Sequence, residues 1–202
     1  IYDHSLKNPE KFWQEASEDI FWFKKPRKIL NKSNPPFYKW FEDGVTNTCY
    51  NALDIHIDQG RGKKIALIYD SPITGNKNQF TYEELRSKVS KFAGALKAQG
   101  ANKGDRVIIY MPMIPEAVVA MLACARIGAI HSVVFGGFAS NELASRIDDS
   151  KAKILVTASC GFEPGRTVEY KPLVDEAIKQ AKHKISKMIL FQRKGHEVKL
   201  NA

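Results

Sequence analysis

Short apolar runs alternate along most of the chain with longer segments in which apolar residues recur every three or four positions. The short runs are rich in β-branched residues and show little alternation between apolar and polar positions, which predicts buried strands. They span residues 64–70, 105–111, 130–135, 153–159 and 187–191. Strands of this kind, separated by helices, are typical of a sheet covered on both faces. We therefore predict an α/β fold with a doubly wound, mostly parallel sheet and helices on both faces.

Helix signals fill the intervals between these runs. Thr81 and Glu84 form a capping box, and the apolar positions that follow recur at helical spacing until Gly100 ends the helix. The segment 114–127 is apolar nearly all round, which predicts a helix buried on several sides. Further helices are expected at 50–60, from residue 140 and around 173–181, with residues 72–78 as a turn.

Residues 1–46 have a different character, because they are dense in aromatic residues and prolines interrupt any long helix. Asn8 is expected to cap a short helix that has Pro9 at its first position. The segment is too short and too broken to form a core of its own. We predict an extended arm whose aromatic side chains pack against a larger body, the α/β part at 47–202.

Composition and charge narrow the classes of partner. The 202 residues are 44% hydrophobic and 26% charged, as in globular proteins, and the formal net charge is +9. A nucleic-acid binder more often shows a basic stripe with interleaved aromatic residues, whereas the C-terminal lysines here fit a solvated helix face. We expect no nucleic-acid partner, and the charge is compatible with a small polyanion such as a nucleotide or coenzyme A. No apolar run approaches the roughly 20 residues that cross a bilayer, so no membrane span is expected.

The cysteines and histidines form no metal or disulfide pattern. Cys49, Cys124 and Cys160 are an odd, scattered set, typical of thiols in a reducing compartment. None of the five histidines lies at metal-ligand spacing from another histidine or cysteine, so no metal site is predicted. His131 falls inside the apolar run 130–135 and is expected to be a hydrogen-bonded core residue.

A loop that follows a predicted strand offers the first candidate ligand site. The nucleotide-binding sequences G-x-x-x-x-G-K-[ST] and G-x-G-x-x-G are both missing. Gly136 and Gly137 come directly after the strand 130–135 and let the backbone approach a flat ligand or a phosphate closely. A tight strand-to-helix turn explains the two glycines equally well.

The second candidate loop is the segment Glu163-Pro164-Gly165-Arg166, which also follows a strand. Proline and glycine favour a turn, and the planar guanidinium of Arg166 can clamp a phosphate. A surface turn with a solvated arginine accounts for the same residues equally well. Ligands of doubly wound sheets bind at the carboxyl ends of the strands, where both loops are expected to lie.

The run MPMIPEAVVAMLACARIGAIHSVVFGGFASNELASRIDDSKAKILVTAS, at 111–159, resembles the N-terminal domain of short-chain acyl-CoA synthetases. These are the acetyl-CoA and propionyl-CoA synthetases of the adenylate-forming superfamily. The segments YDHSLKNPEKFWQEASEDIFWF and FTYEELRSKVSKFAGALKAQGANKGDRV are similar to the same family, so the resemblance covers essentially the whole chain. Residues 163–173 resemble the propionyl-type branch more than the acetyl-type branch.

The resemblance implies a two-step reaction. A short carboxylate, with propionate favoured and acetate as the alternative, attacks the α-phosphate of ATP with the help of Mg2+ and gives an acyl adenylate and pyrophosphate. Coenzyme A then displaces AMP. It also implies a site for the nucleotide end of coenzyme A, in which Arg166 holds a phosphate and the glycines let the adenine lie against the backbone. The residues implied are Phe135, Gly136, Gly137, Glu163, Pro164, Gly165 and Arg166. Acetyl-type members carry an arginine in place of Glu163, so a second positive contact is missing here.

The family's phosphate loop, acyl pocket, magnesium and ribose ligands and C-terminal lysine are all expected beyond residue 202. The chain is therefore predicted to be the N-terminal portion of such a ligase, without a catalytic residue of its own. The alternative is a stand-alone binding module for a small anionic or nucleotide ligand. The resemblance suggests the mitochondrial matrix, with the cytoplasm as the alternative, and says nothing about the oligomeric state.

Overall fold

Four parallel strands form the central sheet of the computed structural model, which describes residues 1–200. They are β5 (Arg106–Tyr110), β6 (Ile130–Val134), β7 (Ile154–Ala158) and β10 (Lys187–Phe191), in the spatial order β10-β7-β5-β6. Every neighbouring pair in this sheet is parallel. The predicted parallel sheet is thus confirmed for four of its five predicted strands.

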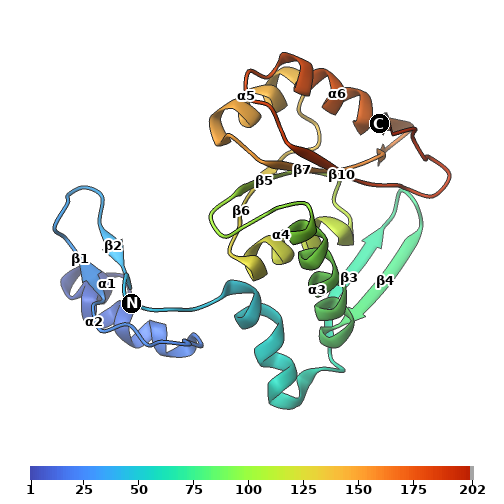
Figure 1. Ribbon diagram of the computed structural model, residues 1–202. Coiled ribbons are helices and arrows are strands. Elements are labelled where there is room, and N and C mark those ends of the chain that lie inside the picture. The colour runs from blue at the N-terminus through green and yellow to red at the C-terminus, as the bar shows by residue number, and fades with distance from the viewer. Residues whose placement is uncertain (201–202) are drawn as a thin grey trace.

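Helices cover both faces of this sheet. Helices α3 (Tyr82–Ala98) and α4 (Pro115–Ile127) lie on one face, and α5 (Ser140–Ser150) and α6 (Tyr170–Gln180) lie on the other (Figure 1). The sheet is therefore doubly wound, as predicted. The chain moves in one direction from β5 to β6 and then returns past β5 to β7 and β10, so the strand order reverses beside β5.

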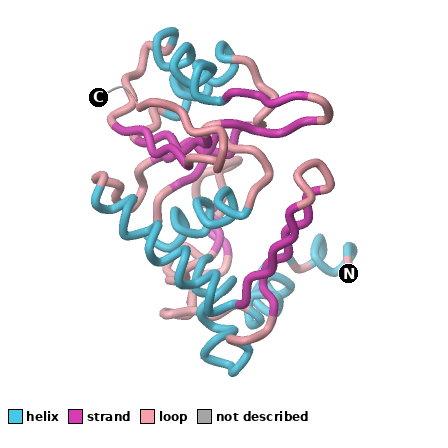
Figure 2. The backbone as a smooth tube through the Cα atoms, turned by 90° about the vertical axis from the view of Figure 1, so that its right-hand side faces the viewer, coloured by secondary structure: helices cyan, strands magenta, loops and turns pink. Residues whose placement is uncertain are grey.

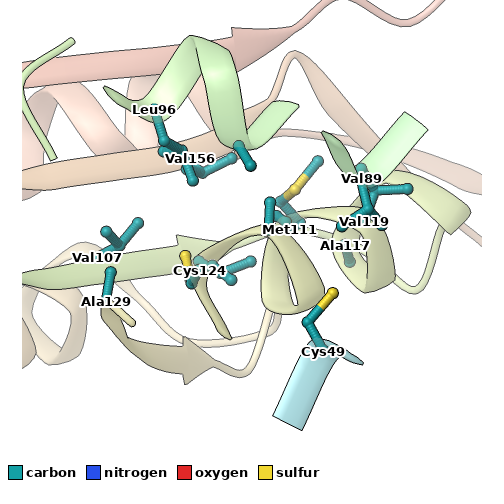
Figure 3. Close-up of a cluster of buried hydrophobic side chains, with 14 of the residues drawn as sticks. Cys49, Val89, Leu96, Val107, Met111, Ala117, Val119, Cys124, Ala129 and Val156 are labelled. Carbon is teal, nitrogen blue, oxygen red and sulfur yellow. The ribbon is translucent and has the colours of Figure 1, made fainter. Parts of the chain in front are cut away.

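The residues of β5 show how the two cores are separated. Val107 and Ile109 belong to the apolar cluster under α3 and α4, part of which is drawn in Figure 3. Ile108 and Tyr110 belong to the cluster under α5 and α6. Side chains alternate between the faces of a strand, and all four of these residues are fully buried. This is why the strand carries a continuous apolar run instead of an alternating pattern.

The helix boundaries follow local chemistry that was visible in the sequence. The Thr81 hydroxyl accepts a hydrogen bond from the Glu84 backbone N–H at 3.2 Å, and the Glu84 carboxylate accepts one from the Thr81 N–H at 2.8 Å. Helix α4 has Pro115 at its first position and ends at Gly128, whose φ of 74° is in the left-handed region.

One predicted strand does not join the parallel sheet. Strand β3 (Ile65–Ser71) pairs with β4 (Asn76–Thr81) in an antiparallel hairpin, which Figure 2 shows apart from the central sheet. The connection between them is a short turn with Gly75 at a φ of 69°, and a parallel crossover needs a dozen or more residues. The expected turn at 72–78 therefore ends earlier, where β4 begins.

Two smaller elements also differ from the prediction. The segment expected as a helix at 50–60 is helical, but it has π-helical geometry over Tyr50–Asp54 and Ile57–Arg61. The loop after β7 is a second hairpin, in which β8 (Cys160–Glu163) pairs antiparallel with β9 (Arg166–Glu169). The turn expected at residues 163–166 is the tip of this hairpin.

The N-terminal arm contains α1 (Tyr2–Lys7), α2 (Pro9–Ala16), a 3-10 turn (Ser17–Asp19) and a short hairpin of β1 (Leu30–Asn31) and β2 (Lys39–Trp40). Figure 1 shows it beside the α/β body, connected by an extended stretch. Asn8 caps α2 as predicted, because its side-chain oxygen accepts a hydrogen bond from the Lys11 backbone N–H at 3.3 Å.

The expected burial of the arm's aromatic residues is wrong for most of them. Trp13 and Trp40 contact each other, with ring centroids 6.1 Å apart, and stay 44% and 40% exposed. Phe37 is 75% exposed. Phe21 and Phe23 do contact the body, because their rings pack 4.8 and 5.1 Å from that of Tyr50 at its start. The arm therefore packs mainly on itself.

The expected burial of His131 is also wrong, since its side chain is exposed. It lies on β6, the last strand of the sheet, which pairs only with β5 in the described part of the chain. An apolar run on such a strand has one side without a neighbouring strand.

None of the helices formed by residues 1–200 combines the length and the apolar character that a membrane span requires.

Candidate functional site

A cavity of about 590 Å³ lies at the carboxyl ends of the parallel strands. Each strand contributes the residues that follow it: 111–114 after β5, 135–137 after β6, 162, 163 and 170 after β7, and 193 after β10. The turn of the β3–β4 hairpin, residues 71–74, supplies a further wall. The loops after β5 and β7 lead to helices on opposite faces, so the cavity occupies the point where the strand order reverses.

Four of the seven predicted site residues line this cavity: Phe135, Gly136, Gly137 and Glu163. The other three, Pro164, Gly165 and Arg166, do not line it. They form the tip and return of the β8–β9 hairpin, where Gly165 adopts a φ of 75°. The two candidate loops thus meet at one cavity, but the hairpin presents its first residue to it and not its arginine.

Arg166 is paired with the other charged residue of the hairpin. Its Nε donates a hydrogen bond to Glu163 Oε2 at 2.7 Å, and its Nη2 lies 2.6 Å from the same oxygen. The side chain of Arg166 is 70% exposed and that of Glu163 is 42% exposed. Solvent screens such a pair, so it contributes little stability, and a stronger anionic ligand can displace the carboxylate.

Gly136 is required by the packing of the protein itself. Its φ is not in the left-handed region, so backbone strain does not explain the glycine. A Cβ added there would collide with the hydroxyl of Tyr170 and would lie 3.3 Å from the Met111 carbonyl oxygen. Tyr170 is 5% exposed, and its ring also excludes a Cβ at Gly161, which would lie 2.6 Å from Tyr170 Cε2.

Gly137 has a different environment. Its φ is also outside the left-handed region, and the three atoms nearest to a Cβ there all belong to the Phe135 ring, with Cε1 at 2.6 Å. Phe135 is 70% exposed, so its side chain can turn away. The packing of the protein therefore constrains Gly137 less than Gly136.

Two tyrosines, Tyr110 and Tyr170, pack against the loop that follows β6. The buried Tyr110 hydroxyl donates a hydrogen bond to the Phe138 carbonyl at 2.7 Å, and its ring packs 4.9 Å from that of Tyr170. Burial, with the charges of Tyr110 and Glu163 as smaller causes, raises the pKa of Tyr170 to about 12. Tyr170 lines the cavity, so at neutral pH it presents a protonated hydroxyl there.

Known families match both parts of the chain. A family model described as AMP-binding enzyme matches residues 56–201, and one described as acetyl-coenzyme A synthetase N-terminus matches residues 1–52. The chain belongs to the AMP-binding enzyme family.

Individual relatives agree with this membership. The human protein named acyl-CoA synthetase short-chain family member 3, mitochondrial, is 56% identical over 193 residues, which cover 96% of this chain and 28% of that protein. An acetyl-coenzyme A synthetase from Streptomyces coelicolor is 45% identical over 197 residues, or 98% of this chain and 30% of that protein. This chain thus spans less than a third of the length of these relatives.

A solved structure supports the fold assignment. Acetoacetyl-CoA synthetase from Streptomyces lividans matches with a TM-score of 0.86 and 26% sequence identity, covering 98% of this chain and 30% of that one. The fold is therefore that of the N-terminal region of an acyl-CoA synthetase, as the sequence resemblance implied.

The sequence did not predict three parts of the cavity. They are the hairpin turn 71–74, Tyr170 and Arg193. Arg193 follows the last predicted strand by two positions, and a cation at a strand end was the available signal. The turn and Tyr170 gave no signal, because each reaches the cavity through a hairpin that the sequence pattern did not predict.

The acidic and metal-binding residue types are dispersed over the described part of the chain. Among residues 1–200, no three His, Cys, Asp or Glu side chains come together as a metal site requires. The carboxylates at the cavity, Asp70 and Glu163, each pair with a cation of the protein.

Proposed function

We propose that this chain is the N-terminal portion of a short-chain acyl-CoA synthetase of the AMP-forming type. The whole protein joins a short carboxylate to the α-phosphate of ATP and releases pyrophosphate. The thiol of coenzyme A then attacks the acyl adenylate, forms the thioester and releases AMP. The relatives named acyl-CoA synthetase and acetyl-coenzyme A synthetase support this reaction class.

The observation that carries the proposal for this part of the chain is the shared cavity. The loop 135–137 and the β8–β9 hairpin, which lie far apart in sequence, meet at the carboxyl end of the sheet. We assign this cavity to the nucleotide end of coenzyme A. Gly137 gives the adenine room to lie against the backbone, and Phe135 offers an exposed ring beside it. Pro164 and Gly165 shape the turn that presents Arg166 to a phosphate.

Arg166 has to exchange partners to bind the phosphate. In the structure its guanidinium contacts Glu163, and a phosphate carries more charge than a carboxylate. The same hairpin position that exposes Arg166 to solvent also leaves it accessible to a ligand that enters the cavity from its rim.

The acid, the cofactors and the compartment belong to the same proposal. Propionate is the favoured acid and acetate the alternative, on the propionyl-type resemblance of residues 163–173. ATP and Mg2+ bind outside the residues described here. The mitochondrial matrix is the favoured compartment, because the mammalian relatives are named as mitochondrial proteins. The cytoplasm is the alternative, because other relatives are bacterial.

The division into an arm at 1–46 and the beginning of the AMP-binding domain at 47–202 is part of the proposal. The extended connection between arm and body supports it, as Figure 1 shows. The last two residues of the second part, 201–202, lie outside the described residues.

The test separates the two half-reactions in the whole protein. Exchange of pyrophosphate into ATP, with propionate or acetate present, measures adenylate formation without coenzyme A. Thioester formation measures both steps. The proposal expects both activities, a higher kcat/KM with propionate, and neither activity from residues 1–202 alone.

Arg166→Ala then examines the assigned site. Loss of one charge-assisted contact to a phosphate is worth roughly 1.5–3 kcal/mol, which raises the KM for coenzyme A about 10- to 100-fold. Pyrophosphate exchange should change little. Lys97→Ala, at an exposed position of α3, removes the same charge away from the cavity and serves as the control.

Three outcomes would count against parts of the proposal. Equal loss of both activities in Arg166→Ala would make the arginine a structural residue. Pyrophosphate exchange with acetate but not with propionate would show that acetate, the alternative, is the substrate. Absence of exchange with every short acid, combined with nucleotide binding, would favour the stand-alone binding module.

A further inference from the structure

The charges that line the cavity do not balance. Its charged side chains are Asp70, Glu163 and Arg193. Asp70 pairs with Lys77 at 2.9 Å, and Glu163 pairs with Arg166 at 2.6 Å. Within residues 1–200, no carboxylate lies at ion-pair distance from Arg193. The cavity therefore holds one uncompensated positive charge, at Arg193.

The backbone and the stem of Arg193 are held in place by its neighbours. Its backbone N–H donates to the Ser159 hydroxyl at 2.9 Å, which ties the end of β10 to the end of β7. The guanidinium carbon lies 4.2 Å from the centroid of the Phe162 ring. His196 packs on the same ring, with centroids 5.0 Å apart. Stacking orients the guanidinium without using its N–H donors, and no partner accepts from them in the described part of the chain.

Tyr170 presents a second donor to the same cavity. Tyr170 and Arg193 both line this cavity. Tyr170 is the first residue of α6, which follows the N-cap residue Glu169. An anion near Arg193 therefore also meets the protonated Tyr170 hydroxyl.

Apolar side chains complete the surroundings. Phe135 and Met113 line the cavity and are 70% and 89% exposed. Exposed aromatic and apolar surface beside a cation suits a ligand with a flat base and a phosphate, because the base can stack while the phosphate binds the guanidinium. A bare inorganic phosphate would leave this apolar surface uncovered.

We propose that Arg193 is a phosphate-binding residue of the cavity and that it takes a phosphate group of a nucleotide. The inference rests on the proposed function, in which that nucleotide is the adenosine end of coenzyme A. Arg193 differs from Arg166 because it binds the ligand without giving up an ion pair. It supplies the second positive contact that Glu163 does not provide in this sequence.

The test measures binding of adenosine 3′,5′-bisphosphate to the whole protein by calorimetry. Saturating 5′-AMP is present so that any adenylate-binding site is filled. Arg193→Gln is expected to raise the Kd of the bisphosphate about tenfold or more, because a charge-assisted contact is lost. Adenosine, which has no phosphate, should bind both proteins equally. Lys194→Gln removes the same charge from the exposed next residue and should change little.

A second measurement does not depend on the folding of a variant. Phenylglyoxal modifies accessible arginines, and peptide mass spectrometry reports the extent at each one. Adenosine 3′,5′-bisphosphate should protect Arg193 in the wild-type protein, whereas adenosine should not. Arg166 is read in the same experiment, which shows separately whether the ligand displaces Glu163.

The outcomes separate the inference from the proposed function. Equal affinity of Arg193→Gln and the wild type, or no protection of Arg193, would overturn the inference while thioester formation still supported the ligase. Arg193-dependent binding in a protein that forms no thioester would support the inference and end the ligase proposal. If the bisphosphate does not bind the wild-type protein at all, the inference is wrong.

Discussion

Gly136→Ala is the change that most directly examines how the cavity floor is built. The added Cβ would collide with the Tyr170 hydroxyl and lie 3.0 Å from Tyr170 Cζ. The tyrosine cannot easily retreat, because its ring packs 4.9 Å from that of Tyr110 and lies against Gly161 on another side. The alanine therefore overpacks a buried region, although its backbone conformation is unstrained.

Overpacking of this kind typically costs about 1–3 kcal/mol of unfolding free energy. In a chain of this size each kcal/mol lowers the melting temperature by about 2–4 °C. Gly137→Ala is the matched control, since the three atoms nearest to its Cβ all belong to the exposed Phe135 ring. Its unfolding free energy should stay within about 0.5 kcal/mol of the wild type.

A double-mutant cycle identifies the colliding atom. Tyr170→Phe removes the hydroxyl, which makes no hydrogen bond within residues 1–200, so this single change should have a small effect. Combined with Gly136→Ala, it should restore at least half of the lost stability, a coupling of about 1 kcal/mol. Urea unfolding followed by circular dichroism supplies the four free energies.

Two results would refute this reasoning. If Gly136→Ala is as stable as the wild type, Tyr170 moves aside freely and the floor is not rigid. If Gly136→Ala is destabilised but Tyr170→Phe restores nothing, the collision lies elsewhere, and the Met111 carbonyl at 3.3 Å is the next candidate.

Two further predictions concern ionisable groups. A hydrogen bond from Lys153 Nζ at 3.0 Å, followed by one from the Asn102 N–H at 2.8 Å, lowers the pKa of Asp105 below its ordinary 3.8. The resulting stability is present above pH 3.8 and is lost as the pH falls through the lowered pKa. Asp105→Asn should therefore make the unfolding free energy, measured with urea, depend less on pH below 3.8 than it does in the wild type. The exposed Asp149→Asn serves as the control, and identical pH profiles of the two variants would contradict this prediction. Burial raises the pKa of the Cys49 and Cys160 thiols, and it raises the pKa of Cys124 to about 12. At pH 7 no thiol of the folded chain should therefore react with dithiobis(nitrobenzoic acid) faster than the chain unfolds. Rapid labelling of one thiol would contradict its burial.

The sequence alone determined the elements whose signals are local. A capping box, a proline at a helix start and a glycine at a helix end act within one turn, so α3 and α4 were predicted close to their observed bounds. Continuous apolar runs predicted the four strands of the parallel sheet, because burial on both faces leaves no polar positions. The loops 135–137 and 163–166 followed from these strands, since the carboxyl ends of parallel strands share one edge.

Only the tertiary structure decided which partner each residue meets. An apolar run indicates that a strand is buried but not which strand lies beside it. The run at β3 was therefore assigned to the parallel sheet, although it forms a hairpin. For the same reason His131 was assigned to the core, although it lies exposed on an edge strand. The hairpin geometry of β8 and β9 turned Arg166 toward Glu163, a pairing that spacing in the sequence does not specify. Arg193 reached the cavity from the far strand of the sheet. Contacts between residues distant in sequence depend on how the elements pack together, and the composition of a single segment does not contain that information.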